Sequence, residues 1–312
     1  MPVRQSVLKM AAGEPPQPSS RRWGISEPVA ALILLAPMLL FFCVSVVYPF
    51  FNTIWLSFFD IRGLGGAKWA GLGNYVRLFH DPSFQSAMAT TLHWTLATTV
   101  ISVGIGWTLA VMCSMAPRAT AVFRIMFFAT YGVSEVVSGF IWLGILRPGE
   151  AGLVNALLSA LGLQGWMQPW LGNPHSAIWA VIFAYAWTQV GLPLLTCYAA
   201  VRSIPNSILE AAYIDGAKPL SMMRHIIFPL SFTGLRVAIF INLLAALRAF
   251  DMIFVLTAGG PARATETMGF FVYREAMTQF KLGYGAAATI ILLICVLIVS
   301  VPAILQRTRE VR

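Results

Sequence analysis

The chain of 312 residues is 58% hydrophobic and only 11% charged, with a formal net charge of +9 at pH 7. Soluble domains carry about 25% charged residues, so this composition excludes an ordinary soluble globular fold and predicts a membrane protein. No G-x-x-x-x-G-K-[ST] phosphate loop, H-E-x-x-H zinc motif or nucleophile elbow occurs, so the sequence predicts no catalytic residue and no metal site.

Six apolar segments are long enough to cross a bilayer, which takes about 20 helical residues. They cover residues 29–56, 92–115, 123–146, 177–201, 230–256 and 285–305. Lipid offers the backbone no hydrogen-bond partners, so we expect each segment to be a helix. The predicted fold class is all-α, a polytopic membrane protein with about six transmembrane helices.

The positions of the Lys and Arg residues predict the orientation of these helices. If the N-terminus is cytoplasmic, the cytoplasmic segments carry twelve Lys or Arg residues, the opposite segments seven, and the fifth span two. Cytoplasmic loops are enriched in these residues, so both termini are predicted to be cytoplasmic. The positive net charge then reflects topology and not a nucleic-acid partner. We expect residues 1–28 to be a disordered cytoplasmic tail, 29–306 a transmembrane domain and 307–312 a short cytoplasmic tail.

The connections between the spans differ in character. The first, residues 57–89, is rich in aromatic residues that suit the outer membrane interface. The third, residues 147–176, contains GLVNALLSALGL, whose apolar spacing predicts a helix. The fifth opens with AGGPARATET, which predicts a turn.

The fourth connection, at about 203–230, reads SILEAAYIDGAKPLSMMRHIIFPL from Ser207 onward. Good helix formers predict a helix over residues 206–214, and Gly216 follows where a left-handed cap residue is needed. Pro219 then begins a second short helix, and Pro229 marks the entry to the fifth span. We predict a helix–turn–helix on the cytoplasmic face with an exposed apolar knob, made by Ile208, Ala211, Ala212 and Tyr213.

This connection closely resembles the EAA loop of binding-protein-dependent ABC importer permeases of the carbohydrate-uptake branch. The matching residues are Glu210-Ala211-Ala212, then Gly216, Ile226 and Phe228-Pro229, with Phe228 in place of the usual Leu. YPFFNTIWLSFFD with GLGNYVRLFHDPSF, and FDMIFVLTAGGPARATET with FVYREA, resemble the same family in the same order. The pattern is most similar to the first permeases of the maltose and glycerol-3-phosphate systems.

The resemblance implies the ABC type I importer permease architecture. It also implies a coupling loop that docks on an ATPase through Glu210, Ala211, Ala212, Asp215, Gly216 and Pro229. Glu210 would pair with a basic residue of that ATPase, and Asp215 would support the turn at Gly216. The implied partners are a second permease in a heterodimer, two copies of the cytoplasmic ATPase, which would hold ATP and Mg, and a periplasmic or lipid-anchored solute-binding protein. The chain itself would need no cofactor and would reside in a bacterial inner membrane.

Polar residues within the spans are candidates for the translocation pathway, because burying them in lipid is costly. Sugars are bound by amide or carboxylate hydrogen bonds and by aromatic faces. The candidates are Glu135, Trp187, Gln189, Asn242, Arg248 and Asp251. Arg248 and Asp251 are three residues apart and could instead pair on one helical face.

The implied cargo is a sugar or a related polar solute such as a sugar alcohol, sugar acid or glycerol phosphate. The alternative function is an ion-coupled secondary transporter of a small polar solute. That class would need chains of acidic or His residues within its spans, which the sequence does not supply.

Overall fold

The computed structural model describes residues 27–63, 65–115 and 120–310. The predicted N-terminal tail lies almost entirely outside the described residues. The chain divides into two compact units, residues 1–52 and residues 53–312. The described part is almost entirely helical, as predicted, and its one sheet is a hairpin of two residues per strand.

The described part of the first unit, from Glu27, is apolar helix. It contains α2 (Glu27–Phe42), a π-helical turn (Cys43–Val47) and most of α3 (Tyr48–Leu56). Together they form a candidate span, Ala31–Leu56, with no residue of its most apolar window buried within the chain. This agrees with the first predicted span.

The second unit begins with a small folded segment before the next span. The strands β1 (Phe59–Asp60) and β2 (Lys68–Trp69) pair antiparallel, and α4 (Gly73–His80) follows them. The Asn74 side chain joins these parts, because its Nδ2 donates to the carbonyl oxygens of Ser57 and Phe59, both at 2.9 Å. The first connection is thus folded and is not an open loop.

The second span is longer than predicted. Its helix α5 runs over Pro82–Met115, so it begins ten residues before residue 92. The reason is a local start signal: Asp81 Oδ1 accepts a hydrogen bond from the Ser83 N–H at 2.8 Å, and Pro82 occupies the first helical position. Hydropathy alone missed this start, because the first turns of α5 are polar.

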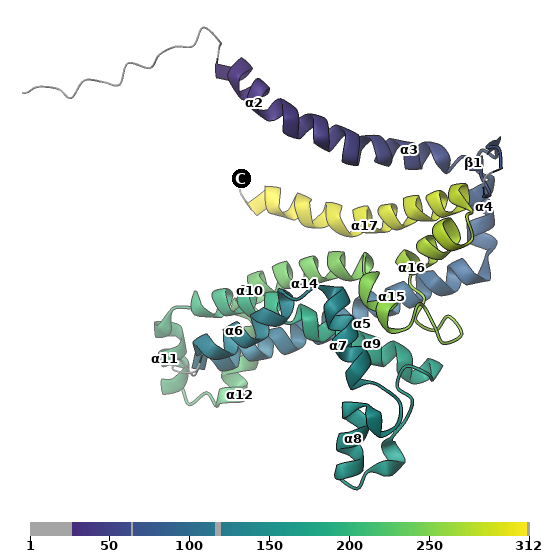
Figure 1. Ribbon diagram of the computed structural model, residues 1–312. Helices are drawn as coiled ribbons and strands as arrows, with labels where there is room; N and C mark the ends of the chain where they lie inside the picture. The colour runs from purple at the N-terminus through teal and green to yellow at the C-terminus, as the bar shows by residue number, and fades with distance from the viewer. Residues whose placement is uncertain (1–26, 64, 116–119, 311–312) are drawn as a thin grey trace, which may run out of the picture. The chain divides into compact units, whose positions relative to one another are not determined.

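Three of the predicted spans are broken helices (Figure 1). Helix α6 (Thr120–Tyr131) meets α7 (Glu135–Ile145) at 101°, and α9 (Pro174–Gln189) meets α10 (Gly191–Arg202) at 49°. The helical stretch 219–230 meets α14 (Phe232–Leu247) at 70°. The described residues therefore contain three unbroken candidate spans, and six if each bent pair counts as one.

The fifth predicted span, 230–256, is not one helix. Helix α14 ends at Leu247, and a separate short helix, α15 (Asp251–Leu256), follows after three residues. The chain then forms the 257–267 loop, α16 (Met268–Tyr273) and a π-helical turn, Arg274–Thr278. Helix α17 (Leu282–Glu310) is the last span, and it includes residues 307–310, for which the sequence predicts a place in the C-terminal tail.

The third connection contains the predicted helix, α8 (Leu153–Ala160), between two short 3-10 turns. Asn155 of α8 is buried, and its Oδ1 accepts from Trp170 Nε1 at 2.9 Å while its Nδ2 donates to the Gln168 carbonyl at 3.1 Å. One buried amide thereby fixes the shape of the connection.

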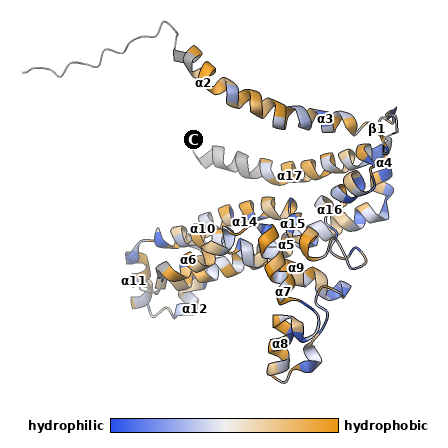
Figure 2. Ribbon diagram, in the orientation of Figure 1, coloured by the Kyte–Doolittle hydropathy of each residue, from blue (hydrophilic) through white to orange (hydrophobic). Residues whose placement is uncertain are grey.

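Small residues let the central helices α5, α10 and α14 pack closely. A Cβ on Gly106 would lie 2.5 Å from Pro193 Cβ of α10, and a Cβ on Gly234 would lie 2.6 Å from Ala200 Cβ. A Cβ on Gly104, by contrast, would meet no heavy atom within 4 Å. Close packing explains Gly106 but not Gly104. Figure 2 shows apolar residues along these helices, with paler, more polar stretches between them.

Candidate functional site

The 203–230 loop has the predicted helix–turn–helix form. Its first helix, α11, covers Asn206–Ile214. Gly216 has φ +77°, and its N–H donates to the Tyr213 carbonyl at 3.0 Å, while the Ala217 N–H donates to the Ala212 carbonyl at 3.0 Å. This pair of bonds is a Schellman motif, which closes a helix by its own backbone.

The second helix of the loop begins at Pro219, as predicted. Helix α12 (Pro219–Met222), a π-helical turn (Met223–Ile227) and α13 (Phe228–Leu230) follow one another up to the break at Ser231. Pro229 lies in α13, one turn before the start of α14. The fifth span is thus entered through a sharp bend and not directly from Pro229.

The loop exposes an apolar surface, but not the full knob that the sequence predicted. Tyr213 is 77% exposed and Ile214 is 83% exposed, and Ile208 and Ala211 are also exposed. Ala212 is only 8% exposed, so it faces the chain's own helices, and its inclusion in the knob was wrong.

Two carboxylates lie on the exposed side of the same loop. Glu210 borders a hollow together with Asn206, Tyr213 and Ile214 of α11 and Met222 of α12. Within the described residues, neither Glu210 nor Asp215 has a side-chain hydrogen bond or ion pair. The turn at Gly216 is therefore held by the backbone, without the support that we expected from the Asp215 carboxylate.

The pathway candidates gather where the helices break. Glu135 is the first residue of α7 and Asp251 the first residue of α15, and these two short helices pack on each other. The contact is close, since a Cβ on Gly139 would lie 2.8 Å from Val255 Cγ1. The two carboxylates are near enough to repel each other. Negative charge is favoured at each helix N-terminus, which offsets part of this repulsion.

The alternative that Arg248 and Asp251 pair on one helical face is wrong. Helix α14 ends at Leu247, before both residues, and no ion pair joins the two among the described residues. Arg248 Nε instead donates to the Leu244 carbonyl at 3.1 Å, and its exposed side chain lies within electrostatic range of Tyr185. The break between α14 and α15 therefore leaves the Arg248 and Asp251 side chains apart.

The uncharged candidates occupy different places. Trp187 packs edge-on against Trp142 of α7, with ring centroids 6.1 Å apart. Gln189 is 7% exposed and is the last residue of α9 before the bend. Asn242 is 3% exposed, and its Nδ2 donates to the Ala238 carbonyl of its own helix at 3.0 Å. Trp187 and Gln189 therefore lie in the broken-helix region. The side chain of Asn242, in contrast, makes its hydrogen bond within α14.

Sequence reasoning missed three polar groups of this region. Ser138 Oγ, Trp142 Nε1 and Tyr185 Oη are buried and have no hydrogen-bond partner within the described part of the chain. Tyr185 also lies within electrostatic range of Glu135. Buried polar groups without partners are unusual, so each of these three is a candidate contact for a polar ligand or a water molecule. The sequence YGVSE at the α6–α7 break, with a Gly and a Ser just before an acidic residue, was the available signal.

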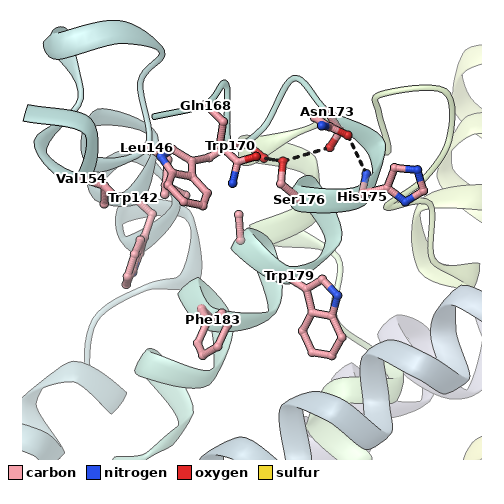
Figure 3. Close-up of a pocket in the computed structure, with 11 residues that line it drawn as sticks. Trp142, Leu146, Val154, Gln168, Trp170, Asn173, His175, Ser176, Trp179 and Phe183 are labelled. Carbon is pink, nitrogen blue, oxygen red and sulfur yellow. Dashed lines mark hydrogen bonds between the residues drawn. The ribbon is translucent and has the colours of Figure 1, made fainter. Parts of the chain in front are cut away.

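A cavity of about 450 Å³ lies nearby, between α7, α8 and α9 (Figure 3). Its wall is largely aromatic, with Trp142, Trp179 and Phe183 among its lining residues. Two of its polar groups are already engaged: Asn173 Oδ1 accepts from the His175 N–H at 3.0 Å, and Ser176 Oγ donates to the Trp170 carbonyl at 2.8 Å. Trp142, whose Nε1 has no partner within the described part of the chain, also lines this cavity.

The 257–267 loop is held by a buried charged network. Arg274 Nη1 donates to Glu266 Oε2 at 2.8 Å, and Arg274 Nη2 donates to Glu275 Oε1 at 2.9 Å. Both carboxylates are less than 5% exposed. Burial raises the pKa of Glu266, although Arg274 and Arg263 act in the opposite direction.

Asp81, at the start of α5, belongs to the same end of the molecule. Burial acts to raise the pKa of Asp81, but hydrogen bonds from Tyr284 Oη at 2.7 Å and from the Ser83 N–H at 2.8 Å together hold the pKa below its ordinary value of 3.8. The fold therefore favours the ionised form of Asp81.

The family model described as "Binding-protein-dependent transport system inner membrane component" matches residues 102–308, which include the broken helices and the 203–230 loop. The chain belongs to this family of permeases.

Individual relatives agree with the family assignment. "Probable ABC transporter permease protein YurN" of Bacillus subtilis is 33% identical over 271 residues, which cover 86% of this chain and 92% of YurN. The "sn-glycerol-3-phosphate transport system permease protein UgpA" of Escherichia coli is 30% identical over 86% of this chain and 90% of UgpA.

A solved structure has the same fold. The bacterial ABC transporter involved in the import of the acidic polysaccharide alginate contains a chain that matches 91% of this permease with a TM-score of 0.76, at 21% identity. The predicted architecture, a multi-pass ABC importer permease, is confirmed. Family membership also decides against the ion-coupled secondary transporter.

Proposed function

We propose that this permease carries a sugar or a related polar solute, received from a solute-binding protein, across a bacterial inner membrane. A separate ATPase, two copies per transporter, would bind ATP and Mg and drive the cycle, and a second permease would complete a heterodimer. Both chain termini would lie in the cytoplasm. The closely similar UgpA is named for sn-glycerol-3-phosphate transport, which supports a small, oxygen-rich cargo.

The observation that carries this proposal is the construction of the 203–230 loop. Its turn is closed by backbone hydrogen bonds alone, so its side chains are left for an external partner. Tyr213 and Ile214 expose apolar surface beside the Glu210 carboxylate, which pairs with no described residue. An exposed aromatic residue next to a charge is typical of a residue cluster that dominates binding at a protein interface. We therefore propose this loop as the ATPase-docking element, with Glu210 as its charged contact.

The broken helices support a pathway through the same bundle. At α7 and α15 they bring Glu135 and Asp251 together. Arg248 lies three residues before Asp251, and Trp187, near the end of α9 with Gln189, packs on Trp142 of α7. Discontinuous helices of this kind form substrate sites in transporters, because their ends expose polar groups within the membrane. Carboxylates can accept hydrogen bonds from sugar hydroxyls, and Trp187 can cover an apolar sugar face. We propose these five residues as pathway residues and assign Asn242 a weaker contribution.

Substitution of Glu210 tests the docking proposal. Glu210→Ala removes the charge, and Glu210→Gln keeps the size and hydrogen-bonding shape of the side chain. Both variants should insert normally, because the residue is exposed and packs on no core residue. Loss of a rim charge weakens association, with less difference at high salt. We expect both variants to retain less ATPase on purification than the unchanged permease at low salt, with the difference shrinking as salt rises.

Wild-type ATPase retention and solute uptake in both variants would contradict the proposal. A control substitution, Arg202→Gln, changes an exposed charge at the end of α10, outside the hollow that Glu210 borders, and should leave retention close to the wild-type level.

A further inference from the structure

We propose that α4, together with the β1–β2 hairpin, is an in-plane membrane anchor whose outward face inserts into the phospholipid headgroup layer. Nothing in the transport function assigned to the 203–230 loop or to the helix breaks requires this surface.

The two faces of α4 carry the first argument. Asn74 and Leu78, four residues apart, are completely buried against the rest of the second unit. The opposite side carries Leu72, just before the helix, Val76 and Phe79, spaced four and three residues apart, with exposed fractions of 65%, 57% and 56%. Residues at this spacing share one helical face. Helix α4 therefore has a second apolar face that no described residue of the chain covers.

Aromatic residues beside α4 extend the exposed apolar surface. Trp69 of the hairpin is 64% exposed, and Trp55, at the end of the first span, is 59% exposed. Their ring centroids lie 6.1 Å apart, and Trp69 also contacts Phe58 and Phe59. Tryptophan is enriched at membrane–water interfaces, where its ring lies at the level of the headgroups.

The position of α4 along the chain decides whether its exposed apolar face meets water or lipid. It lies where α5 and α17 begin and follows directly on the segment that leaves the first span (Figure 1). Contacts link α4 to both α5 and α17. The apolar part of α17 starts at Leu282 itself, so this end of the bundle must lie close to the edge of the hydrocarbon core. The apolar stripe formed by Leu72, Val76 and Phe79 lies at that level, so it faces the headgroup layer and not bulk water.

The charges around the stripe fit phosphate groups. Arg62, Lys68 and Arg77 surround Asp60, which is 3.2 Å from Arg62 Nε and 3.8 Å from Arg77 Nη1. Three cations and one carboxylate leave a net positive rim beside the apolar face. Interfacial helices combine such cations with an apolar face that enters the membrane by about 5–10 Å.

A fluorescent label on the stripe tests this anchor. We would introduce Val76→Cys in the full permease, assembled with its partner subunits in nanodiscs of phosphatidylethanolamine and phosphatidylglycerol, and attach an NBD fluorophore. Cys43 and Cys295, which are not fully buried, would be replaced by Ser beforehand. The control is Thr278→Cys, which is exposed at the end of the π-helical turn Arg274–Thr278 and lies outside the stripe. Quenchers would be lipids with a nitroxide at the headgroup or at acyl carbon 5 or 12, and aqueous iodide.

We expect the label at residue 76 to emit at shorter wavelength than the label at residue 278. The headgroup and carbon-5 nitroxides should quench the residue 76 label more strongly than the carbon-12 nitroxide does. Iodide should quench the residue 278 label more than the residue 76 label. Strong iodide quenching at residue 76 would mean that the stripe faces water, and protection from both iodide and lipid quenchers would mean that a protein partner covers it. Either result would overturn the anchor.

A second measurement does not depend on labelling. Phe79→Glu places a charge on the stripe, and the control, Thr278→Glu, adds the same charge at an exposed position outside α4 and the hairpin. Phe79→Glu should lower the melting temperature of the assembly in nanodiscs more than in detergent micelles, whose surface adapts to the charge. An equal loss in both environments would show that Phe79 acts only within the protein and would contradict membrane contact.

Discussion

The 203–230 loop and the 257–267 loop are built in opposite ways. In the first, the backbone closes the turn, and Glu210, Tyr213 and Ile214 extend outward without partners among the described residues. In the second, Glu266 is buried on Arg274, and the loop is tied back to the bundle. A loop that is tied to the bundle by buried ion pairs contributes to the stability of the fold, whereas one that leaves its charged groups facing outward is available to a partner.

The difference between the two loops yields a general expectation. Substitutions in the 257–267 region should lower the stability of the permease, whether or not partners are present. Substitutions in the 203–230 loop should leave stability nearly unchanged and reduce coupling to the ATPase. The predictions below test this separation, starting with the largest effect.

Arg274→Met should cause the largest loss of stability. It leaves the carboxylates of Glu266 and Glu275 buried without the cation that both contact. Breaking a buried pair by removing one partner costs about 3–5 kcal/mol. Thermal unfolding of the purified permease should show a large decrease in melting temperature. The matched control is Arg263→Met, because the Arg263 side chain is 55% exposed and 3.8 Å from Glu266. That change should cost at most about 1 kcal/mol. Equal effects of the two substitutions would contradict the buried network.

Gly106→Ala should have the next largest effect. Its Cβ would lie 2.5 Å from Pro193 Cβ and 2.9 Å from the Leu194 nitrogen, so α5 and α10 must separate. Overpacking of this kind costs about 1–3 kcal/mol. Gly104→Ala is the control on the same helix, where the added methyl group meets no atom within 4 Å. It should be neutral or stabilising, because Ala is the better helix former. Equal melting temperatures of the Gly106→Ala and Gly104→Ala variants would refute this packing argument.

Gly216→Val should separate folding from coupling. Gly216 has φ +77°, and nothing lies within 4 Å of its Cβ position, so the cost is backbone strain of about 1–3 kcal/mol, confined to the turn. The protein should insert at normal levels but lose solute uptake and ATPase retention. Gly216→Asn is the control, since Asn tolerates the left-handed region better than a β-branched residue does. Equal uptake by the Val and Asn variants would show that the conformation of this turn does not matter for coupling.

Local signals explain which parts of this structure could be predicted from the sequence. The turn at Gly216 and the helix start at Pro219 each depend on one or two residues, whose conformational preferences act wherever they occur. The six apolar runs were equally readable, because their length alone indicates a span. The start of α5 was also encoded locally, by Asp81 and Pro82, but hydropathy obscured it.

The broken helices and the buried network were not predictable in the same way. A continuous apolar run gives no sign that α14 ends at Leu247, because the break is set by the packing of α15 on α7. Spacing on an assumed helix therefore suggested the wrong pair for Arg248. Ala212 was misplaced for a related reason: which face of α11 is buried depends on neighbours that the sequence does not identify. The contact of Arg274 with Glu266 likewise depends on how the chain returns after the 257–267 loop.

The smallest predicted effect concerns pH and Asp81. Because its folded pKa lies below the ordinary value of 3.8, Asp81 stabilises the fold above that value and loses this contribution as pH falls through the lowered folded pKa. The free energy of unfolding should therefore differ between the wild-type protein and Asp81→Asn by a constant amount above about pH 5, and the difference should shrink below about pH 4.

Tyr284→Phe removes the hydrogen bond that Asp81 Oδ2 accepts at 2.7 Å and leaves the ring packing in place. This variant should lose part of the Asp81 contribution at neutral pH and show a weaker dependence on acid. Denaturation of the three proteins in detergent across this range measures both quantities. A wild-type minus Asp81→Asn difference that grows on acidification would reverse the sign of the argument and show that the fold prefers the protonated carboxyl.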